Sequence, residues 1–255
     1  MQNRRWLGLV FISIAVSLII VDSTIVNVAI PAIVDDLGIT STQVQWVQEA
    51  YTLVFASLLL VFGSLADRFG RRRIMLLGVV IFVLSSIAAA FAPTGDLLIL
   101  ARLIQGIGGA MILPTTLSLI NATFRGRERG IAFAVWGSTI GGMAAVGPLL
   151  GGWLTTAFSW RWAFGINIPL GILIIIGVLL TVAESRDENT RSIDIMGGAL
   201  SFITFGALVF GLIEGRTLGW WATEGDFTIG SWTWPWALSP VPVAFLIAIL
   251  GAVAF

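Results

Sequence analysis

The chain has 255 residues, of which 57% are hydrophobic and 11% charged, and its formal net charge is zero. Long apolar stretches in such a composition predict transmembrane helices and exclude an ordinary soluble domain. The balanced charge gives no support for a nucleic-acid partner. The sequence contains no cysteine and no histidine. Disulfides are therefore excluded, and any group that exchanges protons near neutral pH must be a carboxyl group.

The apolar stretches predict eight membrane spans. They cover residues 6–30, 46–66, 74–91, 97–120, 131–156, 163–183, 195–213 and 237–255. The first stretch is too long for an export signal, contains Asp22 and lacks a small-residue cleavage site, so we interpret it as a span. Residues 214–236 are expected to form an outer loop ordered by its aromatic side chains. The predicted fold class is an all-α membrane protein.

The arginines and tryptophans predict how the spans are oriented. Eleven of the 14 arginines precede the first span or lie in the connections after the second, fourth and sixth, whereas only Arg161 and Arg216 lie on the opposite side. Because basic residues concentrate in cytoplasmic connections, we expect a cytoplasmic N-terminus. Tryptophans expected to anchor the opposite face in the headgroup region are Trp46, Trp153, Trp160, Trp162, Trp220, Trp221, Trp232, Trp234 and Trp236.

The connection between the second and third spans carries a specific motif. Its glycines permit a tight reversal, and Asp67, placed among four arginines, can hold the turn in one shape. The pattern G-x-L-A-D-R-x-G-R-R resembles the loop between the second and third helices of major facilitator superfamily transporters. The resemblance implies a gating loop formed by Gly63, Asp67, Arg68, Gly70, Arg71 and Arg72.

Asp22 is the first candidate for chemistry, because it lies well inside the first span. A carboxylate there costs about 2.5–3.5 kcal/mol on insertion scales and needs water, a partner or a proton. Loss of water disfavours its charged form, which suits reversible protonation. A fixed ion pair or hydrogen-bonded strut is the alternative. The segment from Val21 to Pro31, which includes Asn27, resembles the D-x-T-I-V-N-V-A-x-P stretch of fourteen-helix drug:proton antiporters.

Arg102 is the second candidate. It lies roughly 9 Å into the fourth span and Asp22 roughly 16 Å into the first, at 1.5 Å per residue, so the two are within reach if the spans are neighbours. Arginine keeps its proton and would modulate a carboxylate or bind an anion; alternatively it snorkels to the interface. The segment R-L-I-Q-G-I-G-G-A, with Gln105 and Gly106, resembles the fourth-helix motif of the superfamily, where the arginine is associated with proton coupling.

The fifth span is rich in glycine, which lets another helix approach closely; ordinary packing within the bundle is the alternative. Its end resembles the G-P-x-x-G-G antiporter motif of exporters, although Ala134 and Met143 stand where the longer pattern has glycine. The resemblance implies that this face and the gating loop meet a C-terminal bundle, so we expect the 137–152 face to be exposed in this chain. The motif residues are Gly147, Pro148, Gly151 and Gly152.

Two further features lie near the predicted outer face. The sixth span opens with S-W-R-W-A-F-G-I-N-I-P, which includes Arg161 and Asn167 and resembles a stretch of fourteen-helix efflux pumps. We expect this segment to anchor the helix at the interface. Glu49 lies about one turn into the second span and belongs either to an outer vestibule or to the solvated surface.

The resemblance implies a domain organisation. Residues 1–183 are expected to form the N-terminal six-helix bundle of a major facilitator fold, and 184–192 a cytoplasmic connection. Residues 193–255 are expected to be the further helix pair of the fourteen-helix family. On this interpretation the chain stops inside its eighth span and the C-terminal bundle is absent.

The implied function is proton-coupled efflux of amphipathic or cationic drugs across the plasma membrane, here a bacterial inner membrane. Its expected partners are a small-molecule substrate, protons, the lipid bilayer and a C-terminal bundle or partner chain. The alternatives are metabolite uptake by the same fold and a non-transporting interaction module. No enzyme activity, metal or cofactor is expected, because metal-ligand clusters, a nucleophile elbow and a Walker A loop are missing from the sequence.

Overall fold

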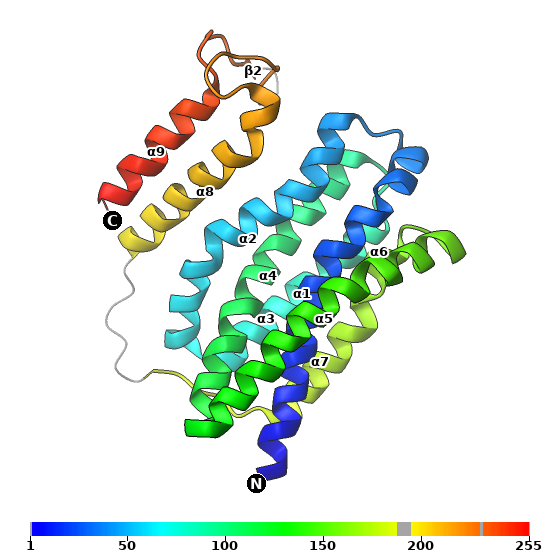
Figure 1. The fold of residues 1–255 in the computed structure, drawn as a ribbon, viewed down its shortest axis with the longest axis vertical. Helices are drawn as coiled ribbons and strands as arrows, with labels where there is room; N and C mark the ends of the chain where they lie inside the picture. The colour runs from blue at the N-terminus through cyan, green and yellow to red at the C-terminus, as the bar shows by residue number, and fades with distance from the viewer. Residues whose placement is uncertain (1, 188–194, 230–231, 255) are drawn as a thin grey trace.

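The structure is a computed structural model that describes residues 2–187, 195–229 and 232–254. Seven helical segments in this part of the chain are long and apolar enough to cross a membrane, so the chain is a multi-pass membrane protein. Figure 1 shows a bundle of long helices with one helix pair beside it. The helices are α1 (Gln2–Leu37), α2 (Ser41–Phe69), α3 (Arg71–Ala90), α4 (Gly95–Thr123), α5 (Gly126–Ala157), α6 (Trp162–Gly165), α7 (Asn167–Thr181), α8 (Ile195–Leu218) and α9 (Pro240–Ala254).

The predicted six-helix bundle with two further helices is confirmed. Short helix α6 and helix α7 together form the sixth span. The predicted eighth span corresponds to α9, which has 15 residues. The predicted start of an outer loop at residue 214 is wrong, because α8 continues to Leu218 and therefore contains Glu214 and Arg216.

Capped turns explain why helices extend beyond the predicted spans. Between α1 and α2, Gly38 adopts a positive φ of 61°. Thr40 and Gln43 then form a capping box, in which each side chain accepts a backbone N–H of the other residue. This arrangement satisfies N–H groups that a helix start leaves unpaired, so α2 begins before its apolar stretch does.

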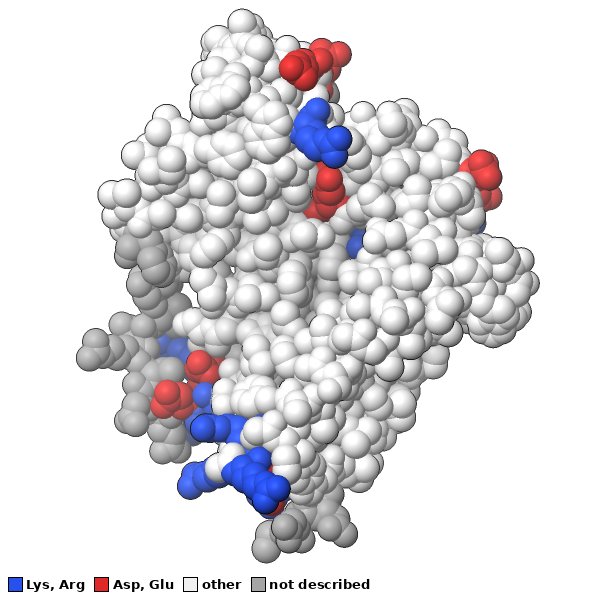
Figure 2. Space-filling model, viewed as in Figure 1, with Lys and Arg blue, Asp and Glu red and all other residues white. Residues whose placement is uncertain are grey.

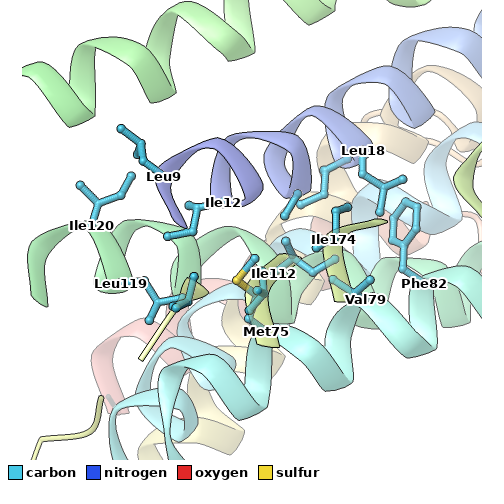
Figure 3. Close-up of a cluster of buried hydrophobic side chains, with 14 of the residues drawn as sticks. Leu9, Ile12, Leu18, Met75, Val79, Phe82, Ile112, Leu119, Ile120 and Ile174 are labelled. Carbon is cyan, nitrogen blue, oxygen red and sulfur yellow. The ribbon is translucent and has the colours of Figure 1, made fainter. Parts of the chain in front are cut away.

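Helices α1 and α4 organise the bundle. Helix α1 packs against α5 and α7, and α4 packs against α2 and α3. Where α3 meets α4, Gly78 and Gly108 let the backbones come close: a Cβ at Gly108 would lie 2.8 Å from the Gly78 carbonyl oxygen. Figure 3 shows the apolar core between these helices, formed by side chains that include Leu9, Ile12, Leu18, Met75, Val79, Phe82, Ile112, Leu119, Ile120 and Ile174.

The glycines of α5 lie on two different faces. Gly147 and Gly151 are buried against α1, where an added Cβ would collide with the side chains of Thr24 and Ile25. By contrast, an added Cβ would meet nothing within 4 Å at Gly137, Gly141, Gly142 and Gly152. The expectation that the whole 137–152 face is exposed is therefore wrong. Gly147 and Gly151 therefore allow α1 and α5 to pack closely inside the bundle. The other four glycines lie on the open side of α5, where no neighbour is within 4 Å of an added Cβ.

The helix pair α8–α9 is joined by a connection with its own aromatic cluster. It contains two short antiparallel strands, β1 (Thr228–Ile229) and β2 (Trp232–Thr233). Rings of Trp232, Trp234 and Trp236 pack edge to face, and Phe227 packs between Phe210 of α8 and Trp234. The aromatic side chains order this connection, as the sequence predicts, and Phe227 attaches it to α8.

Basic side chains gather at one end of the molecule, as Figure 2 shows. The start of α1, the α2–α3 turn and the α4–α5 turn lie at this end in Figure 1. We call it the basic end, defined by residues 4–5, 67–73 and 125–129. The α1–α2 turn and the 219–239 connection lie at the opposite end.

Candidate functional site

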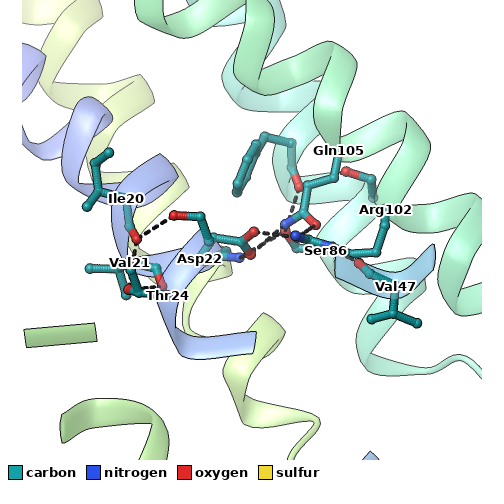
Figure 4. Close-up of polar contacts among 12 residues, drawn as sticks. Ile20, Val21, Asp22, Thr24, Val47, Ser86, Arg102 and Gln105 are labelled. Atoms are coloured by element: carbon teal, nitrogen blue, oxygen red, sulfur yellow. Dashed lines mark hydrogen bonds and ion pairs between the residues drawn. The ribbon is translucent and has the colours of Figure 1, made fainter. Parts of the chain in front are cut away.

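A charged cluster lies buried in the middle of the six-helix bundle (Figure 4). Asp22 of α1 has no exposed surface and Arg102 of α4 is 1% exposed. Arg102 Nη1 donates to Asp22 Oδ2 at 2.5 Å. The predicted proximity of these two side chains is confirmed, and the snorkelling alternative for Arg102 is wrong. Because the α1–α4 contact brings a carboxylate and a guanidinium together, each charge has a partner within the apolar core.

Two uncharged side chains complete the hydrogen bonding of Asp22, and Ser86 accepts from both of them. Gln105 Nε2 donates to Asp22 Oδ1 at 2.7 Å, and Asn167 Nδ2 donates to the same oxygen at 2.8 Å. Both amides also donate to Ser86 Oγ, at 2.9 and 3.1 Å. Helices α4 and α7 thus reach the carboxylate on α1 directly, and α3 joins the network through Ser86. Asn167 was expected in an interfacial anchor; the structure shows it fully buried in this cluster instead.

Arg102 is held by α2 as well. Its Nε donates to the Val47 carbonyl oxygen at 3.1 Å, and its guanidinium lies 4.4 Å from the centre of the Tyr51 ring. Its Nη1 also donates to Gln105 Oε1 at 2.6 Å. Gly106, one residue after Gln105, lets α2 approach, because a Cβ there would lie 2.7 Å from the Tyr51 carbonyl oxygen. These contacts leave Arg102 other partners if Asp22 changes its charge.

The geometry makes two states of Asp22 mutually exclusive. As a carboxylate it accepts a guanidinium and two amide N–H groups, which stabilise its negative charge. Once protonated, it can no longer neutralise Arg102, and an unpaired buried charge is costly. Loss of the negative charge of Asp22 would therefore leave Arg102 without its ion-pair partner in the buried cluster.

A polar cavity of about 210 Å³ reaches the Arg102 side of this cluster. Gln48 Nε2 donates to Asn27 Oδ1 at 2.9 Å in its wall. Glu49 also lines the cavity and is half-buried, which favours the vestibule interpretation over a solvated surface residue. Residues of the cluster and cavity that sequence reasoning missed are Ser86, Val47, Gln48 and Tyr51. They stand in apolar helices without a motif of their own, so only their positions in the bundle identify them.

The α2–α3 turn at the basic end has the predicted shape. Asp67 Oδ1 accepts from Arg71 Nε at 2.8 Å, so the carboxylate does hold the turn. Gly70 adopts a φ of 111°, which favours glycine. Gly63 lies near Pro114 of α4, and Arg68 is exposed with its guanidinium 5.8 Å from the Phe69 ring centre. Neither of these two takes part in the Asp67 contact.

Glu184 was missed by sequence reasoning and is part of this turn. Its carboxylate accepts the backbone N–H groups of Arg72 and Arg73 at 3.0 and 3.1 Å, which caps the start of α3. A Cβ at Gly70 would lie within 2.9 Å of this carboxylate. The connection after α7 is therefore docked on the turn over residues 184–187; the rest of the predicted 184–192 connection lies outside the described residues. Acidic residues after an apolar span, here Glu184, Asp187 and Glu188, were the only signal in the sequence.

Asp36, at the C-terminal end of α1, binds the two residues that lead into α6. Its Oδ2 accepts from Arg161 Nη1 at 2.5 Å and from Trp160 Nε1 at 3.0 Å. Trp160 is 3% exposed, so the expectation that it belongs to an interfacial belt is wrong: its ring and N–H are used inside the protein. Arg161 anchors its segment as expected, but to α1. Pro31 is exposed in α1 and joins neither this contact nor the buried cluster.

Together, the fold and the buried cluster define a polytopic membrane protein with a charged centre in a six-helix bundle. Residues 12–255 match the family model described as Major Facilitator Superfamily, and the chain belongs to this superfamily. The resemblance of its motifs to this family is thereby confirmed.

Curated relatives include drug resistance proteins. Puromycin resistance protein pur8 of Streptomyces alboniger is 43% identical over 218 residues, which cover 85% of this chain and 43% of the relative. Multidrug efflux pump LfrA of Mycolicibacterium smegmatis is 40% identical over 210 residues, which cover 82% of this chain and 42% of the relative. The chain thus spans less than half the length of these relatives.

Solved structures share the fold. A bacterial homolog of the human lysosomal transporter Spinster, inward-facing and unoccupied, aligns with a TM-score of 0.60 and 20% identity over 85% of this chain and 55% of that one. Peptide transporter POT in complex with sulfate aligns with a TM-score of 0.61 and 18% identity over 82% of this chain and 45% of that one. At these identities the likeness concerns the fold alone.

Proposed function

We propose that residues 1–255 form the N-terminal part of a proton-coupled efflux transporter for amphipathic, often cationic compounds. The observation that carries the proposal is the buried Asp22–Arg102 pair at the centre of the bundle. The names of the relatives, a puromycin resistance protein and a multidrug efflux pump, support the direction and the substrate class. The proposed location of the transporter is the plasma membrane, here a bacterial inner membrane.

Proton coupling follows from the exclusive states of Asp22. When a proton binds Asp22, Arg102 loses its charged partner and keeps its bonds to Val47 and Gln105. The contacts among α1, α2 and α4 then change, because Asp22 and Arg102 lie on different helices. When the proton leaves, the pair forms again. A cycle of this kind links proton movement to the arrangement of the bundle.

Transport needs a second bundle that rocks against this one around a midplane site. We propose that the gating loop, held by Asp67 and Arg71 and capped by Glu184, closes the basic end. The open α5 face, with Gly137, Gly141 and Gly142, suits a close-packed helix of that second bundle or of a partner chain. Gly147 and Gly151 are then positioning residues for α1, which carries Asp22.

The basic end is proposed to face the cytoplasm, with the N-terminus on the same side. The bias of the arginines supports this orientation. Single cysteines introduced into the 67–73 turn of this cysteine-free chain should resist an impermeant thiol reagent added to intact cells, and should react once the membrane is opened. A cysteine in the 219–239 connection serves as the exposed control. Labelling of the 67–73 turn from outside would reverse the orientation.

Flux of an amphipathic cation tests the function. In proteoliposomes, a full-length transporter that contains residues 1–255 should move tetraphenylphosphonium against its gradient when a pH gradient is applied. Residues 1–255 alone should give no flux above empty vesicles, because alternating access requires two bundles. Absence of gradient-driven flux in the full-length protein would contradict the proposed function. Flux by residues 1–255 alone would contradict the need for a separate second bundle.

A further inference from the structure

Two acidic side chains lie on α2 and α8, two helices that pack against each other, outside the buried cluster. Glu214 of α8 is 4% exposed, and Glu49 of α2 is half-buried in the wall of the polar cavity. Glu214 directly follows Ile213, which lines the same cavity as Glu49. Figure 2 shows acidic side-chain atoms in a hollow between the α8–α9 pair and the rest of the bundle.

These two carboxyl groups lack a countercharge in the part of the chain that the structure describes. Neither forms an ion pair there, and Glu214 Oε1 is buried without a hydrogen-bond partner. Arg216 on the same helix is exposed and forms none of these ion pairs. Arg102, which also lines the cavity, is already paired with Asp22. Glu49 and Arg102 line the same cavity, but the charge of Arg102 is already matched by Asp22, so the acidic side chains on this side call for a further positive charge.

The space beside Glu49 suits a charged head group. The polar cavity of about 210 Å³ is smaller than the roughly 300–1,000 Å³ of sites that hold a whole drug-sized molecule. Besides Glu49, its walls offer hydrogen-bonding groups from Asn27, Gln48 and Thr52. A cation can lie there against a carboxylate without passing through apolar surroundings.

An apolar cavity lies one helical turn away, toward the basic end. It measures about 440 Å³ and lies between α2, α8 and α9. Leu53 follows Glu49 by four residues on α2, and Phe210 precedes Glu214 by four residues on α8. About one helical turn therefore separates each acidic residue from an apolar residue that lines this cavity. The other lining residues include Val54, Phe202, Ile203, Ala207, Val243 and Ile247.

We propose that Glu49 and Glu214 bind the positively charged group of an amphipathic substrate whose apolar part occupies the cavity between α2, α8 and α9. The proposal rests on the proposed function, because it names a site for that substrate class. It gives the α8–α9 pair a role in recognition. The acidic residues supply charge complementarity, and the apolar cavity supplies the hydrophobic contact.

Binding of octyltrimethylammonium tests the site. Its affinity is measured by calorimetry on the chain in lipid nanodiscs, with the heat of empty nanodiscs subtracted. Glu49→Gln and Glu214→Gln should each weaken binding by about tenfold or more, because a buried charge pair is lost. Glu49→Asp should retain most of the affinity. The matched control is Glu224→Gln, which removes an exposed carboxyl group after α8 and should change the affinity by less than about twofold.

Binding by these variants distinguishes a site for a cation from a pair of proton-carrying groups. Retention of the parent affinity by Glu49→Gln and Glu214→Gln would mean that these groups carry protons instead, and would overturn the proposal. An equal loss in Glu224→Gln, or no binding above empty nanodiscs, would do the same. If circular dichroism shows that Glu49→Gln does not fold, the affinity of Glu214→Gln, a substitution on the other helix, decides whether the proposal holds. Flux in the full-length protein is a separate readout, so gradient-driven flux without this binding would remove only the subsite.

Discussion

Asp22→Asn should reduce pH-gradient-driven flux to the level of empty vesicles in a full-length transporter that contains residues 1–255. Asparagine keeps the size of the side chain and one oxygen that can accept from Arg102, but it cannot bind and release a proton. The coupling step is therefore lost while the bond to Arg102 remains, and the Gln105 and Asn167 amides must reorient because they now meet an N–H group. Drug flux in proteoliposomes with and without a pH gradient measures the effect.

Exchange of substrate without a pH gradient separates a coupling role from a folding defect. Asp22→Asn should still exchange labelled for unlabelled substrate, because this reaction needs alternating access but no net proton movement. Asp35→Asn is the matched control: the same substitution on the same helix, at an exposed position, should leave driven flux near the parent value. If Asp22→Asn transports like the parent, Asp22 is a structural strut and the coupling site lies elsewhere.

Arg102→Met should lower the free energy of unfolding by about 3–5 kcal/mol, because it leaves the Asp22 carboxylate buried without its charged partner. Methionine fills part of the space of the arginine stem, so the cavity left behind is a smaller term. Equilibrium unfolding in mixed detergent micelles, followed by helix content, measures the change.

A second substitution shows whether the loss comes from the unpaired charge. Asp22→Asn combined with Arg102→Met removes both charges and should recover much of the lost stability. Arg5→Met is the control for an ion pair at the surface. Arg5 and Glu128 are 3.3 Å apart with both side chains more than a third exposed, so this change should cost less than about 1 kcal/mol. A double variant no more stable than Arg102→Met would show that the arginine acts through packing.

The buried pair illustrates how far sequence reasoning reaches. Asp22 and Arg102 could be matched because both are charges inside apolar stretches and their depths follow from the rise of a helix. Their uncharged partners could not be found in this way. Asn167 looked like part of an interfacial segment and Ser86 like an ordinary helical serine. Asn167 reaches Asp22, and Ser86 accepts from Asn167 and Gln105, only because α7 and α3 pack beside α1 and α4.

The sequence by itself determined the class of protein, the approximate spans, the bias of basic residues and the short list of groups able to exchange a proton. These are properties of segment length and composition, which do not depend on how the helices pack. Only the tertiary structure decided that Gly147 faces α1 while Gly142 is open, that Glu184 caps α3 and that Glu49 lines a cavity beside Arg102. A helix that is apolar on all sides has no amphipathic period to reveal which face meets a neighbour, so its rotation and partners are set by packing alone.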